Sequence, residues 1–206
     1  MPSYFDLRKI ADDRVRGRVV DGLVRLREAL DVEVPARSAT DSLLLATWNI
    51  REFDSGKYGY RTPEAYFYIA EIISRFDLVA VQEVRDGLYP LQQLRRHLGS
   101  WWDFLVTDVT LGKSGNTERM AYLYDRRKVD FTGLAAELVL PDTTARDGVV
   151  QFARSPYVAS FRAGWSYLTL TTVHIYYGKS VAADPRRLTE ITALAKLVAK
   201  NARNLS

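Results

Sequence analysis

Hydrophobic residues recur at helical spacing near the start of the chain, between residues 6 and 30. Arg and Asp residues separate the apolar positions, which are Ile10, Val15, Val19, Leu23, Leu26 and Leu30. This period predicts one amphipathic helix over the segment. The following stretch, VEVPARSATDS, is rich in Pro, Ser and Thr and predicts a linker. We expect residues 1–40 to cover an exposed face of the neighbouring domain or, alternatively, to act as an arm that binds a partner.

From Ser42 onward the apolar positions become continuous. The runs LLLATWNI and DLVAVQEV have strand length and predict strands buried on both faces. Between them, REFDSGKYGYRTP predicts a loop, and EAYFYIAEIISRF predicts a helix with Pro63 in its first turn. DGLYPLQQLRRHLG predicts a second helix, and we expect His97 to face solvent near its end.

The remainder of the chain is rich in strands. WDFLVTDVT and TERMAYLYD, separated by the Gly-containing LGKSGN, predict a hairpin. SPYVASFR and SYLTLTTVHIYY predict two further strands, and DPRRLTEITALAKLVAKNAR predicts a last helix. Strands that alternate with helices and then form hairpins indicate a layered α/β sandwich rather than a purely parallel sheet.

Composition excludes several kinds of functional site but says little about the fold. The chain has no cysteine, which excludes disulfides, thiolate metal sites and cysteine nucleophiles. Its net charge of +4 suits a polyanionic partner such as nucleic acid, but a basic surface that serves only solubility explains it as well. No apolar leader or membrane-length apolar run is visible, so we expect a soluble, cytoplasmic protein with no membrane partner.

Two polar side chains stand at the ends of the first two predicted strands. Asn49 is the next-to-last residue of LLLATWNI, and Glu83 is the next-to-last residue of DLVAVQEV. An amide and a carboxylate supply the hard oxygen ligands that Mg²⁺ prefers, so the two residues predict a magnesium site if the strand ends meet. Asn49 would otherwise cap a strand-to-loop turn.

Five short motifs occur in a characteristic order: TWNI, QEV, TERMAYLY, RSPYVASF and TVHIYYG. This order, with each motif expected at a strand end, resembles the endonuclease/exonuclease/phosphatase superfamily. The resemblance runs from about Leu43 to the last helix and implies a DNase-I-like layered α/β sandwich. It implies that residues 41–206 are the first part of such a domain.

The resemblance also implies a set of functional residues. Asn49 would position the metal and the scissile phosphate, and Glu83 would bind the metal, either Mg²⁺ or Mn²⁺. Glu118 would orient a catalytic histidine. Arg154 would lie near the substrate phosphate, and His174 would hydrogen-bond the phosphate or protonate the leaving group.

Each of these residues also has a purely structural interpretation. Glu118 would then pair with Arg119 or Arg126 on a hairpin surface, where such pairs contribute little. His174 would be a hydrogen-bonded core histidine. In the loop after Asn49, Tyr58 and Tyr60 either stack on a nucleotide or pack against their own scaffold.

Two later motifs of the superfamily, Gly-Asp-x-Asn and Ser-Asp-His, are absent from the sequence. The resemblance therefore implies the first half of a catalytic domain, inactive alone, whose single sheet has an apolar face. A missing C-terminal half, a second chain or the N-terminal helix would cover that face. The leading hypothesis is a metal-dependent phosphodiesterase, a DNA nuclease in its complete form. The alternatives are a non-catalytic binding or regulatory module that retains half of the nuclease fold, and an unrelated α/β protein.

Overall fold

The computed structural model describes residues 1–53, 55–85, 87–109, 117–140, 151–177 and 184–204. Its strands form two sheets, with the orders β1-β2-β4-β3 and β5-β6-β7. The strands are β1 (Leu45–Phe53), β2 (Leu78–Val84), β3 (Trp102–Val106), β4 (Arg119–Asp125), β5 (Asp130–Glu137), β6 (Tyr157–Ala163) and β7 (Ser166–Thr172). The helices are η1 (Phe5–Lys9), α1 (Asp13–Glu33), α2 (Pro63–Ile73), α3 (Tyr89–Leu98) and α4 (Pro185–Asn204).

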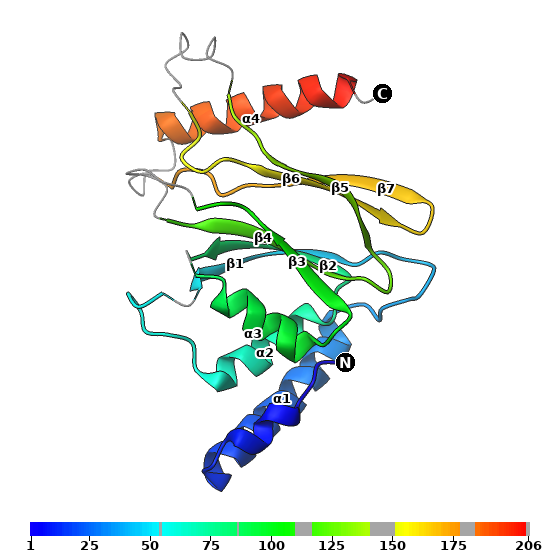
Figure 1. Cartoon of the computed structure of the whole chain (residues 1–206), viewed down its shortest axis with the longest axis vertical. Helices are drawn as coiled ribbons and strands as arrows, with labels where there is room; N and C mark the ends of the chain where they lie inside the picture. The colour runs from blue at the N-terminus through cyan, green and yellow to red at the C-terminus, as the bar shows by residue number, and fades with distance from the viewer. Residues whose placement is uncertain (54, 86, 110–116, 141–150, 178–183, 205–206) are drawn as a thin grey trace.

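These elements stack in layers. From bottom to top, Figure 1 shows α1, then α2 and α3, the sheet that contains β1, the sheet that contains β7, and α4. Strands β1 and β2 are parallel, whereas the pairs β2–β4 and β3–β4 are antiparallel. The predicted layered α/β sandwich is confirmed, and so is the hairpin partnership of β3 and β4.

Alternation along β2 explains why its first four residues, 78–81, are all apolar. Leu78 and Ala80 pack in the core between the two sheets, whereas Val79 and Val81 pack in the core beneath α2 and α3. Successive side chains of a strand point to opposite faces, so a strand that is covered on both faces needs apolar residues at every position. Both faces of the central strand are therefore core.

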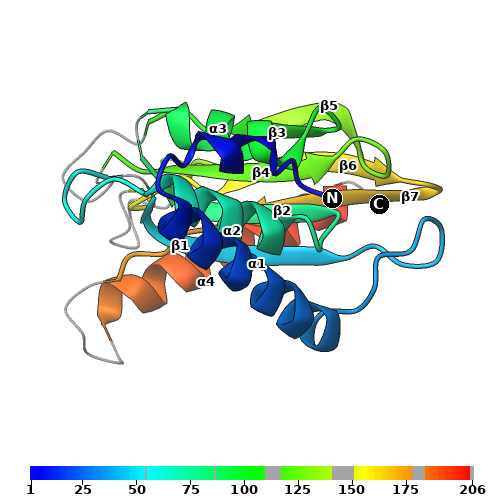
Figure 2. The same ribbon diagram turned by 90° about the horizontal axis from the view of Figure 1, so that it is seen from below.

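The N-terminal helix covers the helical layer rather than a sheet. Val19 and Leu23 of α1 form an apolar cluster with Phe67 of α2, and Figure 2 shows α1 as the layer nearest the viewer. At Gly22 any side chain would collide with the Tyr68 hydroxyl, so glycine permits the close approach of the two helices. The single helix expected over residues 6–30 is wrong, because the chain breaks after η1 and Asp12 caps α1 by accepting from the Arg14 and Val15 amides.

The expectation of a single sheet with a bare apolar face is also wrong. The sheet of β5, β6 and β7 covers that face, through a core that includes Tyr122 and Phe161. Strand β5 was not expected, because its segment DFTGLAAE contains Gly133 and is mostly exposed. Exposed apolar side chains lie instead on α4 and the outer sheet: Leu134, Trp165, Leu188, Ile191 and Val198. Cover of this surface by a C-terminal half or a second chain stays a prediction.

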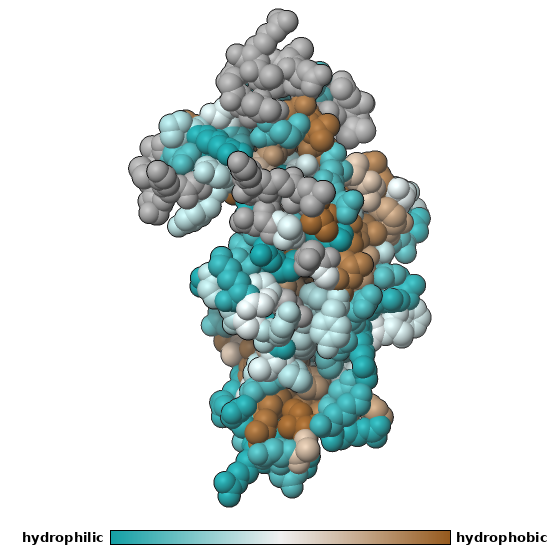
Figure 3. All heavy atoms as spheres, turned by 60° about the vertical axis from the view of Figure 1, so that its left-hand side comes forward, coloured by the Kyte–Doolittle hydropathy of each residue, from teal (hydrophilic) through white to brown (hydrophobic). Residues whose placement is uncertain are grey.

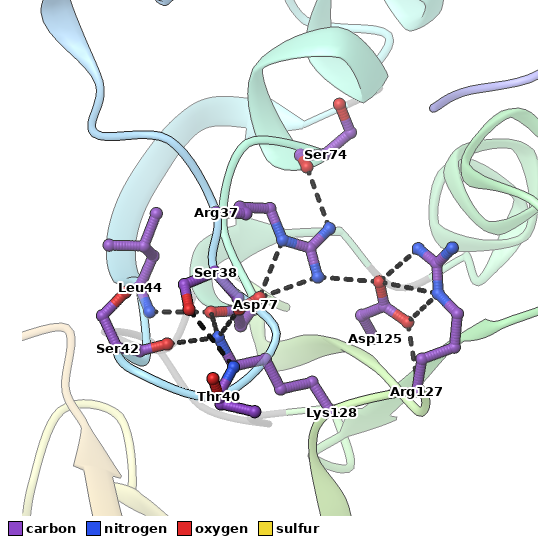
Figure 4. A network of polar contacts seen from close by, with 10 residues as sticks. All are labelled: Arg37, Ser38, Thr40, Ser42, Leu44, Ser74, Asp77, Asp125, Arg127 and Lys128. Atoms are coloured by element: carbon purple, nitrogen blue, oxygen red, sulfur yellow. Dashed lines mark hydrogen bonds and ion pairs between the residues drawn. The ribbon is translucent and has the colours of Figure 1, made fainter.

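The segment expected to be a linker is fixed to the sheet by buried charges (Figure 4). The Arg37 guanidinium donates to Asp77 Oδ1 at 2.7 Å and to Asp125 Oδ2 at 2.8 Å, and both carboxylates are fully buried. Lys128 Nζ lies 3.1 Å from Asp77, and Arg127 donates to Asp125. Burial opposes ionisation of Asp125, but the hydrogen bonds from Arg127 and Arg37 outweigh it and lower its pKa to about 2.

His97 is buried, so the expectation that it faces solvent is wrong. Its ring centroid lies 4.6 Å from that of Phe67, and burial lowers its pKa. It lines a cavity of about 490 Å³ between η1, α1, α2 and α3, which contains none of the candidate catalytic residues. Among the described residues, every helix is too short or too polar to cross a lipid bilayer.

Candidate active site

The ends of β1 and β2 meet, as their side chains predicted. The parallel register pairs Asn49 with Gln82, and Asn49 Nδ2 donates to Glu83 Oε1 at 2.8 Å. The predicted loop after Asn49 begins later than expected, because β1 continues to Phe53 with an irregular register. Within that irregularity the Glu52 amide donates to Glu83 Oε2 at 2.7 Å. Both oxygens of the Glu83 carboxylate are therefore oriented by a donor.

Two acidic residues at this point have left-handed backbone conformations. The φ angle is 48° at Glu52 and 62° at Glu83. Such conformations cost about 1–3 kcal/mol each in residues other than glycine and persist only where the surroundings enforce them. Here the hydrogen bond from the Glu52 amide to Glu83 links the two strained residues.

Glu118 lies at the centre of the site rather than on a hairpin surface. It immediately precedes β4, is 4% exposed, and forms an ion pair with Arg154 Nε. Its Oε2 lies 3.0 Å from His174 Nδ1, and its Oε1 lies 3.5 Å from Arg85 Nη1. Burial acts to raise the Glu118 pKa, but the hydrogen bond to His174 and the Arg154 charge outweigh it and lower the pKa. Glu118 is therefore an ionised carboxylate that holds three cationic or hydrogen-bonding partners.

His174 lies between two carboxylates. It follows the end of β7 by two residues, its Nδ1 faces Glu118, and its Nε2 lies 3.6 Å from Glu83 Oε1. The side chain is 17% exposed, so it reaches the surface and is not a core histidine. A hydrogen bond from Gln82 to Thr172 Oγ1, at 2.7 Å, ties the end of β7 to β2.

The five candidate residues are thus brought together, but not all at strand ends. Glu83 is next to the last residue of β2, and Glu118 immediately precedes β4. Asn49 lies in the middle of β1, Arg154 three residues before β6 and His174 two residues after β7. They meet because the antiparallel strands enter and leave the sheets at the same edge. That edge lies on the left in Figure 1, and Figure 3 turns this side forward to show a mainly hydrophilic face between apolar patches.

Sequence reasoning missed two charged residues that connect the site, Arg85 and Glu52. Arg85 Nη2 lies 3.1 Å from Glu52 Oε2, and Arg85 Nη1 approaches Glu118, so Arg85 bridges the Glu83 side to the His174 side. The signal available was position: Arg85 follows Glu83 by two residues in QEVR.

Glu190 of α4 is a third residue that sequence reasoning missed. Its carboxylate is 1% exposed and accepts from the Ala153 amide at 3.0 Å and the Tyr176 amide at 3.1 Å. These amides are next to Arg154 and two residues beyond His174. One buried carboxylate therefore fixes both segments that carry the basic residues of the site.

We expect Glu190→Gln to destabilise the protein by about 1–3 kcal/mol, because an amide nitrogen cannot accept and one backbone N–H loses its partner. Urea denaturation measures the loss, and the Ala153 and Tyr176 amide resonances should shift. Glu28→Gln, on the exposed surface of α1, is the matched control and should change neither measurement. Equal stability of the two variants would contradict the role of Glu190 in fixing the two segments.

The side-chain oxygen atoms of Glu83 and Asn49 suit a magnesium ion that keeps most of its bound water molecules. Glu83 and Asn49 offer one carboxylate and one amide oxygen, and Mg²⁺ in proteins commonly uses one or two carboxylates with waters and substrate phosphates. Within the described ranges, no group of three or more His, Asp or Glu side chains forms a complete metal cage.

Comparison with known proteins gives matches to nucleases and to solved structures. A protein named Deoxyribonuclease from Thioalkalivibrio sp. (strain K90mix) is 33% identical over 172 residues, which cover 81% of this chain and 43% of that protein. Deoxyribonuclease-1 from Bos taurus is 30% identical over 125 residues, covering 58% of this chain and 42% of the relative. The chain therefore spans about two fifths of the length of these relatives.

A solved structure supports the fold alone. A functionally unknown conserved protein from Enterococcus faecalis V583 superposes with a TM-score of 0.55 at 16% identity, over 76% of this chain and 61% of that one. No model of a protein family matches the chain. The two-sheet sandwich and the matches to deoxyribonucleases agree, and the chain is therefore related to the DNase-I-like superfamily and has its layered α/β sandwich fold.

Proposed function

We propose that the protein hydrolyses phosphodiester bonds of DNA in a metal-dependent reaction. The observation that carries the proposal is the continuous set of contacts from Asn49 through Glu83 and His174 to Glu118 and Arg154. The names of the similar proteins, deoxyribonucleases, favour DNA as the substrate.

The basic residues of the site would bind the phosphate and deliver a proton. Arg154 presents several N–H donors, of which Nε faces Glu118, and its guanidinium would donate to phosphoryl oxygens. Glu118 accepts at His174 Nδ1 and so directs Nε2 towards Glu83. A proton held on Nε2 would pass to the departing alkoxide oxygen. Glu118 also retains the imidazole orientation through the reaction.

Glu83, with Asn49 beside it, would hold the metal ion, Mg²⁺ or alternatively Mn²⁺. A bound divalent ion supplies Lewis-acid polarisation of the phosphoryl oxygens and a template for the substrate. The hydrogen bonds from the Asn49 amide group and the Glu52 backbone orient the Glu83 carboxylate for that task.

Cleavage of supercoiled plasmid DNA tests the proposal, with Mg²⁺, Mn²⁺ or EDTA, using the chain and the complete product of its gene. We expect the complete product to cleave with either metal but not in EDTA, and the chain alone to be inactive. In the complete product Glu83→Gln should abolish cleavage, while Glu28→Gln should cleave normally. Electron paramagnetic resonance of Mn²⁺ should show binding that Glu83→Gln loses. DNA binding without hydrolysis under all conditions would instead support the binding or regulatory module. Cleavage by Glu83→Gln at the normal rate would contradict the metal assignment.

A further inference from the structure

The loop after β1 carries two exposed tyrosines beside the candidate site. It comprises residues 55–61 and is named here the 55–61 loop; Figure 1 shows it on the left, next to the ends of β1 and β2. Tyr58 is 53% exposed and Tyr60 is 76% exposed. Both rings therefore keep much of their surface in water, where a base could reach it. An exposed aromatic ring beside the candidate site offers a flat surface on which a base can stack.

The loop is attached to the site by polar contacts. Lys57 Nζ lies 3.3 Å from Glu52 Oε1, and the Glu52 amide in turn donates to Glu83. Arg61 donates to the Arg51 carbonyl at 2.6 Å, which closes the base of the loop. Glu52 therefore connects Lys57 of the loop to Glu83, the proposed metal ligand.

Hydrogen bonds within the loop fold its backbone into turns. The Lys57 amide donates to Ser55 Oγ at 3.1 Å, and the Gly59 amide donates to the Gly56 carbonyl. Gly59 has a φ of 84°, which favours glycine at that position. The Tyr60 hydroxyl end lies over Gly56, so a side chain there would touch it.

Cations accompany the aromatic rings. The Arg51 guanidinium lies 4.4 Å from the centre of the Tyr58 ring, and Lys57 Nζ lies 5.2 Å from it. Aromatic rings that accept bases, interleaved with cations that attract phosphates, are the combination by which proteins bind single-stranded nucleic acid. In a duplex each base already stacks on its neighbours, so an unpaired base offers the ring face that a tyrosine needs.

We infer that the 55–61 loop stacks an unpaired base of single-stranded DNA beside the phosphate that occupies the site. Tyr60 supplies the stacking surface, and Arg51 and Lys57 attract the flanking phosphates. This inference rests on the proposed function, because it assigns the strand state of the substrate to the same site.

Fluorescence anisotropy in EDTA tests the inference without hydrolysis. The probes are an oligo(dT) strand, an abasic strand of the same length and a duplex of the same length. We expect the chain to bind oligo(dT) more tightly than either of the other probes. Tyr60→Ala should weaken oligo(dT) binding by about 5- to 150-fold, the effect of losing one stacked base. The same variant should leave abasic binding unchanged, because that strand has no base to stack.

Two variants separate stacking from general surface effects. Tyr60→Phe keeps the ring and should bind oligo(dT) as the unaltered chain does. Tyr167→Ala removes a tyrosine that is 73% exposed near the β6–β7 turn, at the opposite end of the sheet, and should also bind normally. Equal weakening by Tyr60→Ala and Tyr167→Ala, or tighter binding of the duplex, would overturn the inference. Failure of the proposed function is distinguishable, because it would abolish metal-dependent cleavage and leave these binding differences intact.

Discussion

Replacing Glu118 with glutamine should lower the rate of metal-dependent DNA hydrolysis by about 10²- to 10⁴-fold, the usual contribution of a positioned proton donor. The amide keeps the size of the side chain but loses the negative charge. In the carboxylate, Oε2 contacts both His174 Nδ1 and Arg154 Nε, and Oε1 faces Arg85. The amide carries an NH₂ group in place of one of these oxygens, so a nitrogen that cannot accept faces either Arg85 or the pair of His174 and Arg154. Both the proton donor and the phosphate-binding cation would lose their orientation.

A kinetic split distinguishes this role from a general loss of structure. The turnover number should fall while the Michaelis constant changes little, because remote parts of the DNA still bind. The urea denaturation midpoint reports whether the variant is folded, and Glu28→Gln serves as the matched substitution on an exposed helix surface. A folded Glu118→Gln protein with normal turnover would exclude Glu118 from the catalytic machinery.

The parts of the site that could be predicted are those fixed by strand polarity. Asn49 and Glu83 end consecutive apolar runs, and the ends of parallel neighbouring strands meet at one edge, so their proximity follows from the pattern. The positions of the helices and of the central strands could likewise be predicted from the spacing of apolar residues. For Glu118, Arg154 and His174 the resemblance supplied the expectation, because no local pattern shows that three antiparallel segments from two sheets return to that edge.

The parts that could not be predicted depend on non-local contacts. Strand β5 has little apolar alternation and exists because it pairs with β6. His97 is buried because it packs against the rings of Tyr66 and Phe67 of α2, which the sequence of its own helix does not show. Arg85 and Glu190 belong to the site through partners distant in sequence, and a charged residue on a predicted helix or loop ordinarily indicates solvent exposure.

The buried charge network at the start of the sheet carries the second large effect. We expect Asp77→Asn to lower the free energy of unfolding by about 3–5 kcal/mol, the usual cost of removing one partner from a buried ion pair. The Asp77 carboxylate is fully buried and accepts from Arg37 at 2.7 Å and from the Leu44 amide at 2.8 Å, with Lys128 at 3.1 Å. An asparagine would place an NH₂ group against some of these donors and leave two partly buried cations with less compensation.

Urea denaturation at neutral pH measures this loss, and Asp130→Asn is the matched control. Asp130 pairs with Arg162 at 2.8 Å, but both side chains are about half exposed, so its replacement should change the free energy of unfolding by less than about 1 kcal/mol. The two substitutions make the same chemical change, and only burial and the number of donors differ. If both variants lost the same small free energy of unfolding, the network would stabilise the protein no more than an exposed ion pair does. Packing alone would then hold the segment around Arg37 in place. A large loss confined to Asp77→Asn would show that buried charge pairing fixes the segment between the N-terminal helix and β1.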